Sequence, residues 1–382
     1  MKPTESKNLD RILLVAVLTL LILGTGVIFS ASSFWSADRH NDYAMYLKRQ
    51  LLRVLIGLAI LFIASKVDYH RYREWTPLLV PLVFALLVAV FFAPTVNGVH
   101  RILPLFGQKF QPAEAMKLML VFYLAAVLAK GPGADRAPIW DSPLAYHYLY
   151  LLVCTALVFF EPDMGTAMVV FFLGLALFFL GGIPKRVIAQ MVAVVIPMLT
   201  LGMLVNPYQW LRLKSFVLSL TGSGPMSYQV EHSLIALSRG GILGVGFGEG
   251  HEKNLFLPQP FSDFILSSLG EELGFVGILV LFVLLFLVFW RGFRIASRAK
   301  DQYGFLLAGG ITCMILINAL INAGVVLNLL PTTGLPFPFI SYGGSSLFMY
   351  MAGVGILLNV SRSPEPSFKD FTSERGRAGF RK

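Results

Sequence analysis

The residues of this sequence that could carry out chemistry are charged groups placed beside long apolar runs. Asp263 lies in LPQPFSDFILSSLGEELG, with Phe261 and Phe264 close to it in the sequence. A carboxylate that is partly buried among aromatic rings has a raised pKa, which makes it a better base than a solvated aspartate. The same residue could instead cap a following helix, so a base and a capping residue are both open.

Another carboxylate has a lysine close to it in the sequence. Glu114 and Lys117 are three residues apart in QPAEAMK, and this spacing places them on one face of a helix. A charge at membrane depth is costly unless it is paired or hydrated, so such residues are candidates for function. A structural ion pair is the competing interpretation.

Asp163 follows Glu161 and Pro162 in EPDMG, directly ahead of an apolar run. A carboxylate in the first turn of a helix is stabilised by the helix dipole, so Asp163 is either a plain cap or a ligand-binding group.

Three basic residues stand where another apolar run begins, namely Lys48, Arg49 and Arg53. They either reach out to lipid headgroups or bind a phosphate.

Two segments are rich in glycine, and the second of them is also rich in proline. GGILGVGFGEG at 240–250 follows no strand and opens no helix of a βαβ unit, which argues against a nucleotide-binding loop. The segment NAGVVLNLLPTTGLPFPFISYGGSS at 322–346 has an irregular backbone, which must be buried in protein or line a wet cavity. No Ser-His-Asp arrangement or metal-ligand spacing is evident in the sequence.

The elements that position these residues are predicted to be transmembrane helices. The chain has 382 residues, 56% hydrophobic and 14% charged, whereas soluble domains carry about 25% charged residues. A membrane span needs about 20 apolar residues, and the first such run, at 12–29, is expected to be a retained span rather than a cleaved signal peptide. The sequence predicts an all-α integral membrane bundle with ten spans: 11–32, 49–66, 75–93, 112–129, 145–160, 165–182, 187–206, 268–290, 304–326 and 345–360.

The distribution of basic residues predicts the orientation of the chain. Placing both termini in the cytoplasm puts most of the 31 Lys and Arg residues on the cytoplasmic side, as membrane topology favours. The net charge of +10 is therefore a topology signal, and we expect no nucleic-acid partner. The longest break between spans, 206–267, then lies outside.

We expect a single membrane domain at 1–360 and a disordered cytoplasmic tail at 361–382. Cys154 and Cys313 lie in apolar runs, which argues against a disulfide or a metal site.

Several motifs, in this order along nearly the whole chain, resemble those of the SEDS family (shape, elongation, division and sporulation; the RodA and FtsW type), with a closer likeness to FtsW. They are FQPAEAMK at 110–117, EPDMGTA at 161–167, SLIALSRGGILGVGFGEG at 233–250, SDFILSSLGEELGFVG at 262–277 and the segment at 322–346.

The resemblance implies a peptidoglycan glycosyltransferase that polymerises lipid II at the outer face of the bacterial cytoplasmic membrane, in division or elongation. It implies that Asp263 is catalytic and that Glu114, Lys117 and Asp163 support it. Cations for the leaving pyrophosphate would be Lys117 and Arg101, with Lys48, Arg49 or a divalent ion, Mg²⁺ or Mn²⁺, as further candidates. The signature loop comprises Pro331, Gly334, Pro336, Pro338, Ser341, Tyr342, Gly343 and Gly344.

The family also implies partners: the lipid-linked glycan strand, a class B penicillin-binding protein and other division or elongation proteins. A lipid II flippase and a non-catalytic scaffold are the alternative functions. Three positions depart from the family pattern. Glu161 replaces a glutamine, Gln259 replaces a glutamate, and Asn328 replaces a glycine.

Overall fold

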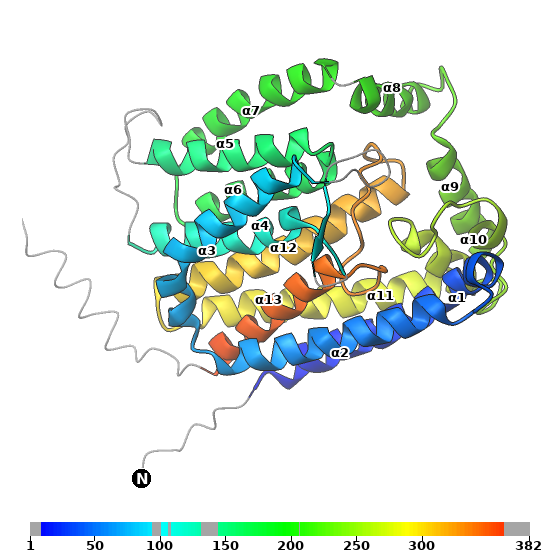
Figure 1. The fold of residues 1–382 in the computed structure, drawn as a ribbon, viewed down its shortest axis with the longest axis horizontal. Helices are drawn as coiled ribbons and strands as arrows, with labels where there is room; N and C mark the ends of the chain where they lie inside the picture. Colours follow the sequence, from blue (N-terminus) through cyan, green and yellow to red (C-terminus); the bar gives the residue numbers. More distant parts are fainter. Residues whose placement is uncertain (1–8, 94–100, 106–107, 131–143, 206, 363–382) are drawn as a thin grey trace, which may run out of the picture.

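The computed structural model describes residues 9–93, 101–105, 108–130, 144–205 and 207–362. Its long helices lie roughly side by side in a bundle (Figure 1). Each of the ten predicted spans is occupied by a helix, which confirms the all-α fold. These helices are α1 (Arg11–His40), α2 (Met45–Lys66), α3 (Tyr69–Val90), α4 (Pro112–Leu128), α5 (Leu144–Phe160), α6 (Met164–Leu180), α7 (Lys185–Val205), α11 (Ile265–Ser297), α12 (Gln302–Val326) and α13 (Ser345–Ser361).

Four of the described helices, α1, α3, α11 and α12, are long and apolar enough to cross a membrane on length and composition alone. Helices α5, α6 and α13 are apolar but shorter, so the number of spans stays a prediction. Large apolar side chains such as Leu55, Phe62, Leu78 and Phe286 are exposed on the outside of the bundle. A contiguous apolar exterior of this kind is what helices present to lipid.

The predicted break at 206–267 is largely helical. It contains α8 (Pro207–Leu220), α9 (Tyr228–Gly240) and the short α10 (Glu252–Leu255). Helix α9 packs against α11, so this segment lies on the bundle. A small antiparallel hairpin, β1 (Leu103–Leu105) and β2 (Gln108–Phe110), precedes α4. The sequence did not predict this hairpin, because strands of three residues are too short to show an alternating pattern.

The glycine-rich segment at 240–250 closes a break in α11. Gly274 has non-helical angles, φ 63° and ψ −163°, which leaves backbone groups on both sides without helical partners. The glycine-rich segment supplies those partners: Val245 and Gly246 donate N–H groups to the carbonyls of Glu271 and Glu272, while Phe275 and Val276 donate to Gly241 and Ile242, at 2.9–3.1 Å. A Cβ on Gly244 would lie 2.0 Å from the Glu272 carbonyl oxygen. Glycine is therefore required here for close backbone approach rather than for a phosphate.

Different helix ends and loops meet at the two ends of the bundle. At one end, which we call the terminal end, the start of α1 lies beside the last turns of α11 and α13. The opposite end, which we call the site end, holds the starts of α4, α6, α11 and α13 and the segment after α12. The start of α1 and the end of α13 therefore lie on one side, as the topology prediction requires.

The predicted tail at 361–382 falls outside the described residues, apart from Ser361 and Arg362. Cys154 and Cys313 are buried free thiols.

Candidate active site

Asp263 stands in a turn just ahead of α11, at the site end, and its side chain is partly exposed. Its Oδ1 accepts a hydrogen bond from Ser262 Oγ at 2.8 Å. Its backbone carbonyl accepts another from Asn322 Nδ2 of α12 at 2.8 Å. Burial raises the pKa of the Asp263 carboxyl above its ordinary value, and the Ser262 hydrogen bond offsets only part of that rise. Asp263 is therefore held from two sides and is a stronger base than a solvated aspartate.

Three other charged groups lie close enough to act on Asp263. The charges of Arg101 and Arg212 lower the pKa of Asp263, and the charge of Asp163 raises it. Arg212, on α8, also donates from Nη1 to the Thr332 carbonyl at 3.1 Å, so it touches the signature loop. Sequence reasoning did not select Arg212. The available signal was its positive charge inside the long break between spans, which it shares with Lys214, Arg239 and Lys253.

The signature loop between α12 and α13 wraps around the turn that carries Asp263. Ser341 Oγ donates to the Ser262 carbonyl at 2.6 Å, and the Tyr342 N–H donates to the Phe261 carbonyl at 2.9 Å. Gly334 has φ +76°, and a Cβ there would lie 3.5 Å from Asp263 Oδ2. A side chain at this position would strain the backbone and would lie in van der Waals contact with the carboxylate.

The prolines of the loop are buried or half-buried. Pro331 and Pro338 are buried, and Pro336 is half-buried. Gly343 and Gly344 are half-buried where α13 begins, and a Cβ on Gly343 would lie 2.6 Å from Ser346 Oγ. The irregular backbone is thus buried in protein, as predicted from its composition.

Glu114 and Lys117 form an ion pair inside the bundle. Lys117 Nζ lies 2.8 Å from Glu114 Oε2, and the side chains are 0% and 2% exposed. Lys117 Nζ also donates to Asn318 Oδ1 at 3.2 Å, and Asn318 Nδ2 donates to the Pro336 carbonyl at 2.7 Å. This placement favours the structural pair over direct contact with a pyrophosphate. Lys117 is connected to the signature loop through Asn318.

Asp163 is a helix cap, which is the simpler of the two roles that its sequence left open. Its Oδ1 accepts the Thr166 N–H at 2.9 Å, so it caps α6. Its Oδ2 accepts from Gln111 Nε2 at 2.5 Å, which ties the start of α6 to the start of α4. It also contributes to the field at Asp263. Asp163 is thus a cap that lies next to the site.

Glu161, the acidic replacement beside Asp163, is fully buried. Burial, and to a smaller extent the Asp163 charge, raises the pKa of Glu161 to about 9. The residue is then neutral at pH 7, and a neutral carboxylic acid resembles the glutamine amide of the family pattern in shape and polarity. The substitution therefore does not add the negative charge that the sequence suggests.

The basic cluster at the start of α2 separates into two parts. Lys48 is exposed and pairs with Asp42 at 2.8 Å, and Arg49 is also exposed. Arg53 turns inward, with its guanidinium 4.2 Å from the ring centre of Tyr342. Its Nε and Nη1 are buried and make no hydrogen bond to any described residue. Of the three, Arg53 is the one placed at the signature loop.

The other two departures lie near the loop without touching Asp263. Asn328 has φ +56°, a conformation that glycine adopts easily and asparagine tolerates, and its Nδ2 donates to Ser219 Oγ at 3.2 Å. Gln259 is exposed. Within the described part of the chain, no group of three or more His, Cys, Asp or Glu residues gathers as a metal site.

Comparisons with known proteins show which family the chain is similar to. The family model for FtsW, RodA and SpoVE, described as cell cycle protein, matches residues 11–365. A probable peptidoglycan glycosyltransferase FtsW from Geobacter sp. (strain M18) is 36% identical over 355 residues, covering 92% of this chain and 96% of the relative. Stage V sporulation protein E of Bacillus subtilis (strain 168) is 35% identical over 370 residues, covering 94% of this chain and 98% of the relative.

Two solved structures share the fold. A chain of a peptidoglycan synthase complex that coordinates polymerization and crosslinking aligns with TM-score 0.74 and 26% identity, covering 93% of this chain and 98% of that one. The rod shape determining protein RodA of Thermus thermophilus aligns with TM-score 0.68 and 28% identity, covering 93% and 97%. With its apolar helices and these matches over nearly its whole length, this multi-pass membrane protein belongs to the FtsW, RodA and SpoVE family of cell cycle proteins.

Proposed function

We propose that this protein is a peptidoglycan glycosyltransferase that polymerises lipid II, with Asp263 as the general base. The names of its relatives support the reaction class. The observation that carries the assignment to Asp263 is its geometry. A partly exposed carboxylate of raised pKa is fixed by α12 and by the signature loop, with Arg101 and Arg212 nearby.

In the proposed reaction, the 4-hydroxyl oxygen of an acceptor sugar attacks the anomeric carbon of a lipid-linked donor. A new glycosidic C–O bond forms, the bond from that carbon to the pyrophosphate oxygen breaks, and the lipid pyrophosphate leaves with the bonding electron pair. Asp263 accepts the hydroxyl proton. A positioned base of this kind contributes roughly 10²- to 10⁴-fold in rate.

The leaving pyrophosphate needs nearby cations. Arg101 and Arg212 act on Asp263 electrostatically, and Arg53 lies at the signature loop with two buried nitrogens. We assign pyrophosphate binding to these three arginines. Lys117 supports the site indirectly, since its ammonium is fully buried and holds Asn318.

A divalent cation, Mg²⁺ or Mn²⁺, is a further candidate cofactor for this site. Mg²⁺ is commonly bound through one or two carboxylates plus substrate phosphates. Asp263 would supply the carboxylate, because Asp163 is buried and both of its oxygens already accept hydrogen bonds. When bound, it would offset the charge that develops on the pyrophosphate.

The proposed location is the bacterial cytoplasmic membrane, with the site end facing the periplasm or cell exterior. The basic terminal end then faces the cytoplasm, as the positive-inside rule favours. We further propose a class B penicillin-binding protein as partner, supported by the likeness to a chain of a complex that couples polymerization with crosslinking. The closer relatives named FtsW favour a role in division.

The test is polymerisation of labelled lipid II by the purified full-length chain, with and without a class B penicillin-binding protein. Asp263→Asn should reduce glycan chain formation on the order of 100-fold or more. Asp38→Asn, an exposed aspartate on α1, is the matched control and should retain wild-type activity.

Equal polymer from wild type and Asp263→Asn would contradict the assignment of the base. If wild type made no polymer but moved lipid II across vesicle membranes, the flippase alternative would replace the proposal. If neither activity were found and the variants still supported growth, a scaffold would be favoured.

A further inference from the structure

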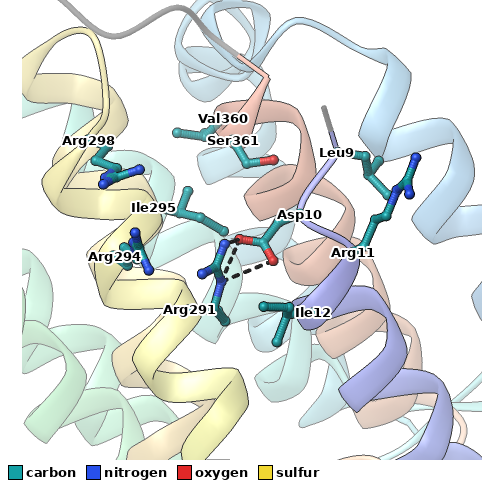
Figure 2. Close-up of a pocket in the computed structure, with 10 residues that line it drawn as sticks. All are labelled: Leu9, Asp10, Arg11, Ile12, Arg291, Arg294, Ile295, Arg298, Val360 and Ser361. Atoms are coloured by element: carbon teal, nitrogen blue, oxygen red, sulfur yellow. Dashed lines mark hydrogen bonds and ion pairs between the residues drawn. The ribbon is translucent and has the colours of Figure 1, made fainter. Parts of the chain in front are cut away.

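A pocket of about 430 Å³ opens at the terminal end, on the opposite side of the bundle from Asp263. It lies between the start of α1, the last turns of α11 and the end of α13 (Figure 2). Among the described residues that line it, four are arginines and one, Asp10, is acidic. The lining therefore has a clear excess of positive charge, which the proposed glycosyl transfer does not use.

One of the arginines is fixed by the aspartate. Arg291 donates to Asp10 through Nε at 2.8 Å and through Nη2 at 2.5 Å. Asp10 also accepts the Leu13 N–H at 3.0 Å and caps α1. This pair joins the start of α1 to α11 at the wall of the pocket. Arg294 and Arg298, one and two turns further along α11, line the same pocket (Figure 2).

The pocket is also partly apolar. Ile12, Ile295 and Val360 contribute to its wall. Ile12 is 46% exposed, and Val15, one turn further on the same face of α1, is 61% exposed. The wall of the pocket thus continues into an apolar outer surface of α1. A ligand that fits both surfaces has an anionic head and an apolar chain.

The position of the pocket along the membrane normal agrees with a ligand that has an anionic head and an apolar chain. Trp290 is 45% exposed on α11, and the guanidinium groups of Arg291 and Arg294 lie 5.6 and 5.7 Å from its ring centre. Tryptophan is enriched at the level of the lipid headgroups. The arginines of the pocket therefore stand where headgroup phosphates are found.

We propose that this pocket binds the phosphate headgroup of an anionic glycerophospholipid from the cytoplasmic leaflet. Arg294 and Arg298 contact the phosphate, and an acyl chain lies along Ile12 and Val15. Basic pockets between helices on the cytoplasmic side recognise anionic headgroups in this way. The site is independent of the proposed glycosyltransferase activity.

The experiment measures lipid binding by the full-length protein in a neutral detergent. Phosphatidylglycerol, phosphatidylcholine and inorganic phosphate are titrated separately, and binding is followed by native mass spectrometry and by the thermal unfolding midpoint. Wild type should bind phosphatidylglycerol in preference to phosphatidylcholine. Arg294→Gln combined with Arg298→Gln should weaken phosphatidylglycerol binding about 25-fold, on the basis of roughly fivefold for each arginine.

The matched control is Lys185→Gln combined with Arg186→Gln, which removes the same charge from exposed positions at the start of α7, at the same end of the bundle. This control should bind phosphatidylglycerol like wild type. Should the glutamine variant unfold without lipid, Arg294→Lys combined with Arg298→Lys keeps the charge and should retain most of the binding.

Two results would overturn the proposal. If the pocket variant (Arg294→Gln with Arg298→Gln) and the control (Lys185→Gln with Arg186→Gln) lost phosphatidylglycerol binding equally, the pocket arginines would contribute only diffuse positive charge. If inorganic phosphate bound as tightly as phosphatidylglycerol, the ligand would be a free anion rather than a lipid.

Discussion

In the part of the chain that the structure describes, two lysine–glutamate pairs are buried, and their surroundings differ. Lys117 and Glu114 belong to one helix and lie 2.8 Å apart. Lys253 and Glu272 come from α10 and α11, and Lys253 Nζ also donates to Ser30 of α1 at 2.6 Å. The first pair is connected to the signature loop through Asn318. The second joins three elements and fastens the glycine-rich segment against α11.

The comparison shows that burial of a charged pair is not sufficient to mark an active site. Both pairs are costly to bury and are stabilised by the partner and by further hydrogen bonds. What separates them is the path of contacts that leads away from each lysine. From Lys117 that path reaches Pro336 and the loop beside Asp263, whereas from Lys253 it reaches the buried Ser30 of α1, away from that loop. Lys117 is therefore a positioning residue, and Lys253 is a structural one.

The largest effect is expected for Lys117→Met. It leaves Glu114 buried without its cation, which costs about 3–5 kcal/mol of stability, and it releases Asn318 from one side. Polymerisation per folded molecule should fall severely, as measured with labelled lipid II on protein that remains folded. The double variant Glu114→Gln with Lys117→Met should regain stability without regaining activity. If the Lys117→Met variant polymerised lipid II at the wild-type rate per folded molecule, Lys117 would have no role in positioning the site.

Lys253→Met should cost a similar amount of stability, again about 3–5 kcal/mol, because Glu272 loses its cation. Polymerisation per folded molecule should stay near the wild-type rate, since Asp263 and the signature loop keep their contacts. Thermal unfolding and polymerisation are measured on the same preparation. A loss of activity as severe as that of Lys117→Met, at equal folded fraction, would erase the distinction between the two pairs.

Asn322→Leu should have the next largest effect. Asn322 Nδ2 donates to the carbonyls of both Asp263 and Leu335, and each buried carbonyl left unbonded costs about 1–3 kcal/mol. The turn that holds Asp263 then loosens, so the polymerisation rate should drop. Asn359→Leu is the control, because Asn359 also makes two backbone hydrogen bonds, to Ser65 and Tyr69, but at the terminal end. If the two variants lost activity equally, the effect would be one of stability alone.

Gly334→Ala should have a smaller effect. Its φ of +76° makes a side chain cost about 1–2 kcal/mol, and the new Cβ would stand 3.5 Å from Asp263 Oδ2. We expect a lower rate with little change in the amount of folded protein. Gly222→Ala, with φ +65° and nothing within 4 Å of its Cβ, carries the same backbone penalty far from Asp263. Equal rates for the two variants would show that the contact with Asp263 is unimportant.

The smallest effect is a shift in pH dependence for Ser262→Ala. The Ser262 hydrogen bond lowers the pKa of Asp263, while burial raises it. A base is active when deprotonated, so activity should fall as the pH drops through the raised pKa. Removing the hydrogen bond should raise that pKa further and move the acid limb to higher pH. An acid limb that moved to lower pH, or did not move, would argue against Asp263 as the titrating base.

The raised pKa of Asp263 affects stability in the opposite direction to activity. A buried carboxyl with a raised pKa binds its proton more tightly in the folded state, so its contribution to stability is present at low pH and is lost as the pH rises through the folded pKa. Asp263→Asn should therefore leave the thermal midpoint at pH 7 unchanged or higher. A clear decrease would show that the Asp263 carboxylate stabilises the fold.

The sequence by itself determined the helices and the main charged residues of the site. Runs of apolar residues specify helices almost without tertiary information, because lipid leaves every backbone group to be satisfied within its own segment. Asp163, Asp263 and the pair of Glu114 and Lys117 stood out because charges beside apolar runs are rare. The motifs at 110–117, 161–167 and 322–346 then indicated the family.

Only the tertiary structure decided what each of these residues touches. It paired Lys117 with Glu114 and Asn318 inside the bundle, brought Arg212 to the signature loop, and separated Arg53 from Lys48. It also paired the glycine-rich segment with the break at Gly274. These contacts join positions far apart in the chain, and local spacing carries no information about them. The sequence identified which charges are expensive to bury, and the fold decided which of them are neutralised in the interior and which remain beside Asp263.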